Sequence, residues 1–98
     1  MKRAFAISIS LFSLFSLAAD WPEFRGPGAQ GHAVNARIPA QIGPTKNLKW
    51  KVAVPGAGWS SPVIVKGRIY ITSAITRGIG FSLNTICLDA ATGQLIWN

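Results

Sequence analysis

Residues 89–97 read DAATGQLIW, and this stretch decides the fold. Its first half is turn chemistry, because the Asp89 carboxylate can accept hydrogen bonds from backbone amides ahead of it and Gly93 tolerates a positive φ. Its second half, residues 94–97 (QLIW), predicts a short strand. Residues 85–88 (TICL) predict another strand just before the turn. The stretch is therefore expected to be two strands joined by a tight turn.

A second pair of strands is predicted upstream. Residues 62–65 (PVIV) are short and apolar on both faces, which is typical of a strand covered on both sides. Lys66-Gly67 fits a two-residue hairpin turn, and residues 68–73 (RIYITS) predict the returning strand. Residues 75–84 (ITRGIGFSLN) are expected to form a longer connection. The pattern predicts four short antiparallel strands and an all-β fold.

Farther upstream the chain changes character twice. In residues 48–54 (LKWKVAV), every second residue is a large apolar one, with lysine or alanine between them. This period of two predicts a half-buried strand that stands apart from the other four. Residues 19–47 carry frequent proline and glycine without helical or alternating periodicity, so they are expected to be an irregular lead-in. No helix is expected after the N-terminal segment.

Residues 1–18 have the three parts of a secretory signal peptide. Lys2 and Arg3 give a positive start, residues 4–17 are uncharged and apolar, and small residues follow, with Ala18 suited to cleavage. The apolar run is shorter than the roughly 18–20 residues that span a bilayer. We therefore expect a secreted or periplasmic protein with no membrane anchor after cleavage.

Charge and cysteine content exclude several classes of protein. The chain of 98 residues has a formal charge of +7, which becomes +5 when Lys2 and Arg3 leave with the signal peptide. The remaining cations form no block, so a nucleic-acid partner is not expected. Cys87 is the single cysteine, which excludes an intrachain disulfide. It lies far from the cleavage site, which argues against a lipid anchor, and its apolar strand predicts a small buried thiol.

The spacing Asp89-x-x-Thr92-Gly93-x-x-x-Trp97 resembles the repeat of PQQ-like β-propellers, the superfamily of the quinoprotein alcohol dehydrogenases. Residues 58–65 (GWSSPVIV), followed by residues 67–70 (GRIY), look like the inner strand and hairpin of such a blade. The lead-in residues 21–27 (WPEFRGP) also resemble the start of exported members. A departure is Cys87, where the family commonly has alanine.

The resemblance implies that residues 48–98 are a closing strand and the first blade of an incomplete propeller. The Asp and Thr-Gly would build the turn between the third and fourth strands, and Trp97 would pack against the neighbouring blade. Residues 49–52 would be the outermost strand of the last blade, with sheet partners beyond Asn98. A propeller has roughly 4–8 blades, so the partners expected first are the remaining blades. A truncated or fragmented product is expected.

The motifs that could carry chemistry are weak. Residues 26–31 (GPGAQG) match the letters of a dinucleotide fingerprint but lack the strand before and the helix after it, so a turn-rich loop is the better interpretation. His32 has no Cys, Asp or Glu at ligand spacing and is expected to be a surface loop residue. Ser60 and Ser61 lack the sequence context of a serine nucleophile.

No catalytic, cofactor-binding or metal-binding residue is assigned from the sequence. The carboxylates are too few and too scattered for a paired mechanism, namely Asp20, Glu23 and Asp89. Trp50 and Trp97 are interpreted as packing at blade interfaces. Trp21 and Trp59 leave a stacking role toward a carbohydrate or quinone open, because flat aromatic faces suit flat ligands.

Two functions follow from these expectations. The first is an exported propeller that serves as a binding scaffold, with no catalytic residue in this chain. The alternative is the N-terminal piece of a PQQ-dependent dehydrogenase, in which PQQ and calcium would be held only by the full ring. Further repeats alone after Asn98 would favour the scaffold, whereas axial acidic residues and a haem-binding C-x-x-C-H would favour the oxidoreductase.

Overall fold

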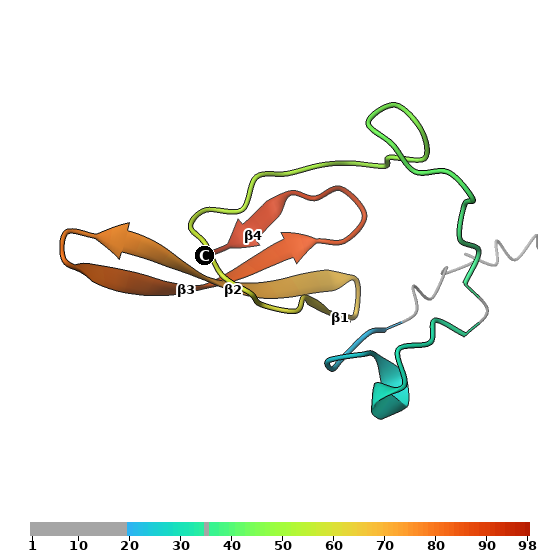
Figure 1. Ribbon diagram of the computed structural model, residues 1–98, viewed down its shortest axis with the longest axis horizontal. Coiled ribbons are helices and arrows are strands. Elements are labelled where there is room, and N and C mark those ends of the chain that lie inside the picture. Colours follow the sequence, from blue (N-terminus) through green and yellow to red (C-terminus); the bar gives the residue numbers. More distant parts are fainter. Residues whose placement is uncertain (1–19, 35) are drawn as a thin grey trace, which may run out of the picture.

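A computed structural model of the chain describes residues 20–34 and 36–98, and the predicted signal peptide, residues 1–18, lies outside these ranges. The described part is all-β, as predicted, with a single antiparallel sheet in the order β1-β2-β3-β4 (Figure 1). The elements are a 3-10 turn, η1 (Pro27–Ala29), followed by β1 (Val63–Val65), β2 (Arg68–Arg77), β3 (Gly80–Asp89) and β4 (Leu95–Trp97). Within the described residues, no helix has the length and apolar character needed to cross a membrane.

Two tight turns lie where the sequence predicts them. Lys66 and Gly67 join β1 to β2 with φ values of 48° and 74°, the pair of positive φ angles that a type I′ hairpin turn requires. Asp89 begins the turn between β3 and β4, where Gly93 has a φ of 74°. The first turn fixes the register that places Val63 opposite Tyr70, and the second joins the strands in which Cys87 lies opposite Trp97.

The expected long connection over residues 75–84 is wrong. β2 and β3 instead pair without interruption from Arg68–Asp89 to Arg77–Gly80, and a two-residue turn at Gly78-Ile79 joins them. Gly78 has a φ of 55°, so it supplies the conformation that reverses the chain. β1 and β4 pair only with the other end of the hairpin, so its tip extends beyond both edge strands (Figure 1).

Residues 48–54, predicted as a strand with sheet partners beyond Asn98, form no strand among the residues described here. These residues make no sheet ladder, and their apolar side chains are largely exposed apart from Trp50, which is half-buried. Alternating apolar residues favour an extended backbone, but a strand also needs a partner with free backbone groups. β1 is likewise only half-buried at the sheet edge, not covered on both sides as its composition predicts.

The core lies near the C-terminal end of β3, where the sheet has all four strands. Ile86, Cys87 and Leu88 are the buried hydrophobic residues of the described chain, and the Cys87 thiol is free and fully buried, as expected. Tyr70 and Trp97 flank Cys87 on neighbouring strands, with their ring centroids 6.0 Å apart. So small a core means that packing within this sheet alone supplies little of the stability of a folded domain.

The described part of the lead-in, residues 20–34 and 36–47, is irregular as predicted, and its start pairs with one sheet edge. The backbone groups of Trp21 and Ile64 exchange two hydrogen bonds of 2.8 Å, and the Lys66 amide donates to the Asp20 carboxylate over 2.9 Å. Residues 26–31 form turns around η1, which agrees with a turn-rich loop. The exposed edge of β1 is thereby closed to another strand near Ile64.

Candidate functional site

The carboxylates of the described chain each hold a backbone amide. Asp20 accepts from Lys66, and Glu23 accepts from the amide of Gly28 over 3.1 Å. Asp89 accepts hydrogen bonds within its own turn. His32 lies exposed in the lead-in, as expected. Among residues 20–34 and 36–98, no three His, Cys, Asp or Glu side chains gather where they could hold a metal ion.

The Asp89 turn is built as the sequence predicts. One carboxylate oxygen accepts the amides of Ala91 and Thr92, each at 2.9 Å, and the Thr92 hydroxyl at 3.0 Å. These hydrogen bonds, led by the Thr92 hydroxyl, hold the pKa of Asp89 below the ordinary aspartate value. The Asp89 carboxylate therefore has a structural role, because its hydrogen bonds hold the shape of the turn.

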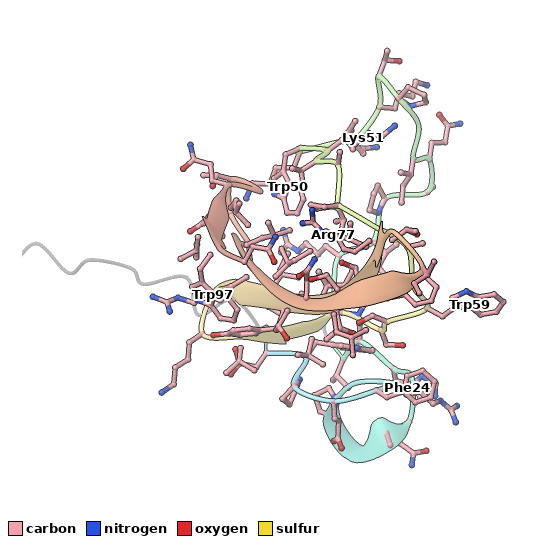
Figure 2. All side chains as sticks on the ribbon, turned by 90° about the vertical axis from the view of Figure 1, so that its left-hand side faces the viewer. Phe24, Trp50, Lys51, Trp59, Arg77 and Trp97 are labelled. Atoms are coloured by element: carbon pink, nitrogen blue, oxygen red, sulfur yellow. The ribbon has the colours of Figure 1, made fainter. Side chains whose placement is uncertain are left out.

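Trp50 lies on this turn, although forty residues separate them. Its indole Nε1 donates to the Ala90 carbonyl over 3.1 Å, and its ring lies so close to Gly93 that a Cβ there would meet ring carbon Cε3 at 2.5 Å. Figure 2 places Trp50 outside the sheet, on the chain that crosses above it. Trp50, interpreted from the sequence as packing at a blade interface, thus contacts the Asp89 turn of this sheet.

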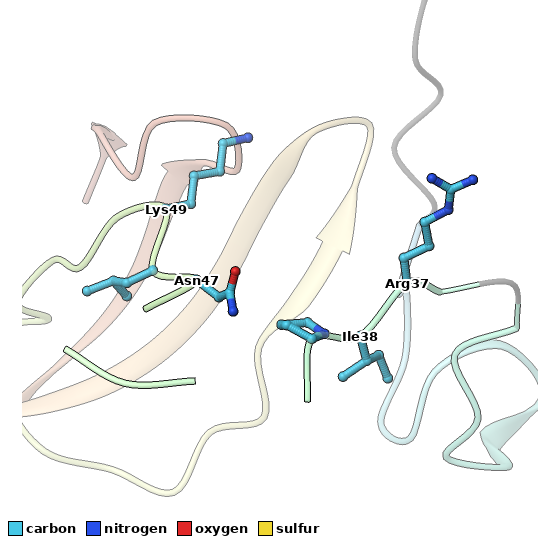
Figure 3. A pocket seen from close by; sticks show the side chains of 6 residues that line it. Arg37, Ile38, Asn47 and Lys49 are labelled. Carbon is cyan, nitrogen blue, oxygen red and sulfur yellow. The ribbon is translucent and has the colours of Figure 1, made fainter. Parts of the chain in front are cut away.

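Three hollows of the described surface are large enough for a small ligand. The largest, about 580 Å³, lies between two loops and is lined by Arg37, Ile38, Pro39, Asn47, Leu48 and Lys49 (Figure 3). All six residues are exposed, and their polar groups do not converge. A ligand site needs convergent polar groups in a formed cavity, so this gap between loops is a poor candidate.

A second hollow of about 390 Å³ lies under the lead-in, bordered by Trp21, His32 and Ile64 among other residues. Its walls are mostly apolar, and the Asp20 carboxylate at its margin is already bonded to Lys66. Beside Asp20 the hollow offers the imidazole of His32, which alone is not the convergent set of polar groups that a ligand site needs.

The third hollow, about 440 Å³, lies between the segment 57–60 and the β2–β3 hairpin. Trp59 stands at its margin with its side chain fully exposed, and it extends away from the sheet in Figure 2. Thr72 and Thr85 lie opposite each other on β2 and β3 and also line it. Of these three hollows, this one combines an exposed aromatic ring with two threonine hydroxyl groups on facing strands.

Ser60 belongs to the wall of this third hollow. Its hydroxyl oxygen accepts the backbone amide of Thr72 over 3.0 Å, which ties the segment 57–60 to β2. Ser61 is exposed beside it. The structure thus gives Ser60 a backbone-pairing role, in keeping with the lack of a nucleophile motif.

The sequence identified Trp59 as a stacking candidate but missed the hollow beside it. Ala57 forms an isolated bridge with Ala74, and this contact folds the segment back along β2. A glycine- and proline-rich segment carries no sequence signal for such a distant backbone pairing. Trp21, the other open candidate, instead lies against Gly26 and β1.

The chain has no match among protein-family models, curated proteins or solved structures.

Proposed function

We propose that this chain forms the closing segment and first blade of an exported PQQ-like β-propeller that acts as a binding scaffold. The four strands of the sheet follow one another as an antiparallel meander, which is the arrangement of a propeller blade. The Asp89 turn joins β3 to β4, where the resemblance expects it. These features support the blade.

The observation that carries the proposal is the contact of Trp50 with the Asp89 turn. Leu48-Lys49-Trp50 repeats the L-x-W pattern of Leu95-Ile96-Trp97, with which β4 ends. Trp50 lies on the Gly93 turn of this sheet, so Trp97 would lie on the corresponding turn of the next blade. Repeating this contact around a ring would bring residues 48–54 beside the last blade as its outermost strand.

Exposed apolar side chains give a second line of support. Large apolar residues are exposed along β4, at the four-stranded end of the sheet, namely Leu95, Ile96 and Trp97. An isolated soluble domain rarely leaves so many in water, whereas a blade buries such residues against its neighbours. Each described carboxylate accepts a hydrogen bond from a backbone amide, which gives these groups a structural role within the proposed blade.

The size of the native protein tests this function. An antibody raised against residues 44–60 is applied to periplasmic and secreted fractions, with a deletion strain as control. A band several times larger than the mature chain supports a ring with further blades. A band at the size of the mature chain overturns it, because one sheet with two exposed faces is not a propeller.

A further inference from the structure

The hollow beside Trp59 has walls fixed by backbone pairing. The Ala57 and Ala74 backbones exchange hydrogen bonds of 2.8 and 2.9 Å, and Ser60 accepts from Thr72. One wall is therefore the segment 57–60, and the other is the β2–β3 hairpin. A hollow held from both sides in this way is formed before a ligand arrives, which lowers the cost of binding.

The hollow carries no charge. Its lining consists of Ala57, Gly58, Trp59, Ser60, Thr72, Ser73, Ala74, Leu83, Asn84 and Thr85. A charged ligand would leave water without a counter-charge here, which is unfavourable. The uncharged lining therefore selects for neutral ligands and disfavours anionic ones such as carboxylated quinones.

Hydroxyl groups converge on one face of the hairpin. Thr72 and Thr85 are directly opposite in the register, so their side chains stand on the same face. Both residues are exposed, and in the described part of the chain neither hydroxyl makes a hydrogen bond. The Ser60 oxygen accepts an amide but keeps its own proton to donate.

Trp59 adds a flat apolar surface at the margin. Its side chain is fully exposed, so the whole indole plane is open to a ligand. A sugar ring presents both surfaces that this arrangement matches, because its C–H face packs on an aromatic plane while its hydroxyls pair with Ser and Thr side chains. The volume of about 440 Å³ falls within the range of small-molecule sites.

We propose that this hollow binds a neutral saccharide, with one ring against Trp59 and its hydroxyl groups on Thr72 and Thr85. The proposal rests on the scaffold function and names its ligand class. The site is compatible with a ring, because it lies on the part of the hairpin beyond the pairing of β1 and β4. The proposal places neighbouring blades against the four-stranded part and the saccharide on the rest of the hairpin.

The test uses the exported protein at its native length. Short neutral oligomers of glucose, xylose and N-acetylglucosamine are titrated while tryptophan fluorescence is recorded, with galacturonate oligomers as the anionic comparison. At least one neutral oligomer is expected to bind with a Kd of about 1 mM or lower, and the anionic one more weakly. Trp59→Ala should lower the affinity about tenfold, and Trp59→Phe should restore most of it.

Two further variants complete the design. Thr85→Val keeps the shape of the side chain but removes its hydroxyl, so it should weaken binding severalfold. Ile79→Ala changes an exposed residue outside the hollow and should leave binding unchanged. Circular dichroism and urea midpoints establish that each variant is folded.

The proposal is overturned if no neutral oligomer binds the folded protein, or if Trp59→Ala binds as tightly as the wild type. Tighter binding of the anionic oligomer also overturns it. The native size is measured on the same preparation. A protein of multi-blade size that binds no saccharide refutes the site alone, whereas binding by a protein of single-sheet size refutes the ring and retains the site.

Discussion

Gly93 has a positive φ and lies directly beneath the Trp50 ring, so two separate requirements exclude a side chain there. Gly93→Ala should lose the left-handed conformation cheaply available to glycine and should also displace the indole, at a cost of about 2–4 kcal/mol. Urea unfolding followed by tryptophan fluorescence measures this loss.

Gly67→Ala is the matched control for that substitution. Gly67 has the same φ of 74°, but a Cβ there would meet nothing within 4 Å. It should therefore cost only the backbone term, about 1–2 kcal/mol. Equal losses for the two variants would contradict the Trp50 contact, since the difference between them reports the displaced ring.

Asp89 should make the free energy of unfolding fall at acidic pH. Its folded pKa lies below the ordinary aspartate value of about 3.9, so the unfolded chain binds the proton first. The stabilisation is therefore complete above the unfolded pKa and is lost as pH falls through the folded one. Urea midpoints measured from neutral pH downward should fall in this window, and Asp89→Asn should flatten that part of the profile. An unchanged profile in Asp89→Asn would show that other groups cause the acid loss.

At the scale of the elements, the β1–β2 turn offers a stabilising substitution. Lys66 has a φ of 48°, a conformation that asparagine adopts more readily than lysine. Lys66→Asn should stabilise the protein by about 0.5–1 kcal/mol, measured as a higher urea midpoint. Lys66→Gln removes the same charge without favouring the turn, and a rise of equal size in that variant would refute the conformational explanation.

Turns were the elements most predictable from the sequence. Lys66-Gly67 and Asp89-x-x-Thr92-Gly93 carry local chemistry that fixes their shape, and both lie where expected. Residues 75–84 misled because Gly78 and Gly80 indicate a connection, while here they form the end of a long hairpin. Three large apolar side chains of this stretch, Ile79, Phe81 and Leu83, are exposed in the sheet, so burial against a core does not explain why these residues pair as strands.

Residues 48–54 and the saccharide site were less predictable for a shared reason. The alternation of apolar residues around Trp50 predicts an extended backbone, but it does not predict which strand that backbone pairs with. In the same way, Trp59 is recognisable as an exposed aromatic candidate, whereas the wall beside it needs the pairing of Ala57 with Ala74. Both depend on contacts distant in sequence, which local patterns do not encode.

At the scale of the whole molecule, Trp50 ties the chain before the sheet to its last turn. Trp50→Ala removes the ring contact with Gly93 and the hydrogen bond to Ala90, and should cost about 2–4 kcal/mol in the native-length protein. Limited proteolysis should then cut residues 48–58 faster. Trp59→Ala is the control, because its exposed ring should leave stability unchanged. Equal losses in both variants would contradict the role given to Trp50.

The full burial of Cys87 makes its thiol a probe of how often the sheet opens. Its thiol lies near the C-terminal end of β3 between Tyr70 and Trp97, so an alkylating reagent reaches it only when β3 separates from its neighbours. Under fast reclosing, the rate of alkylation reports the fraction of molecules that are open at any moment. The single thiol of the chain can thus report how often the sheet opens in the intact protein, without any added label.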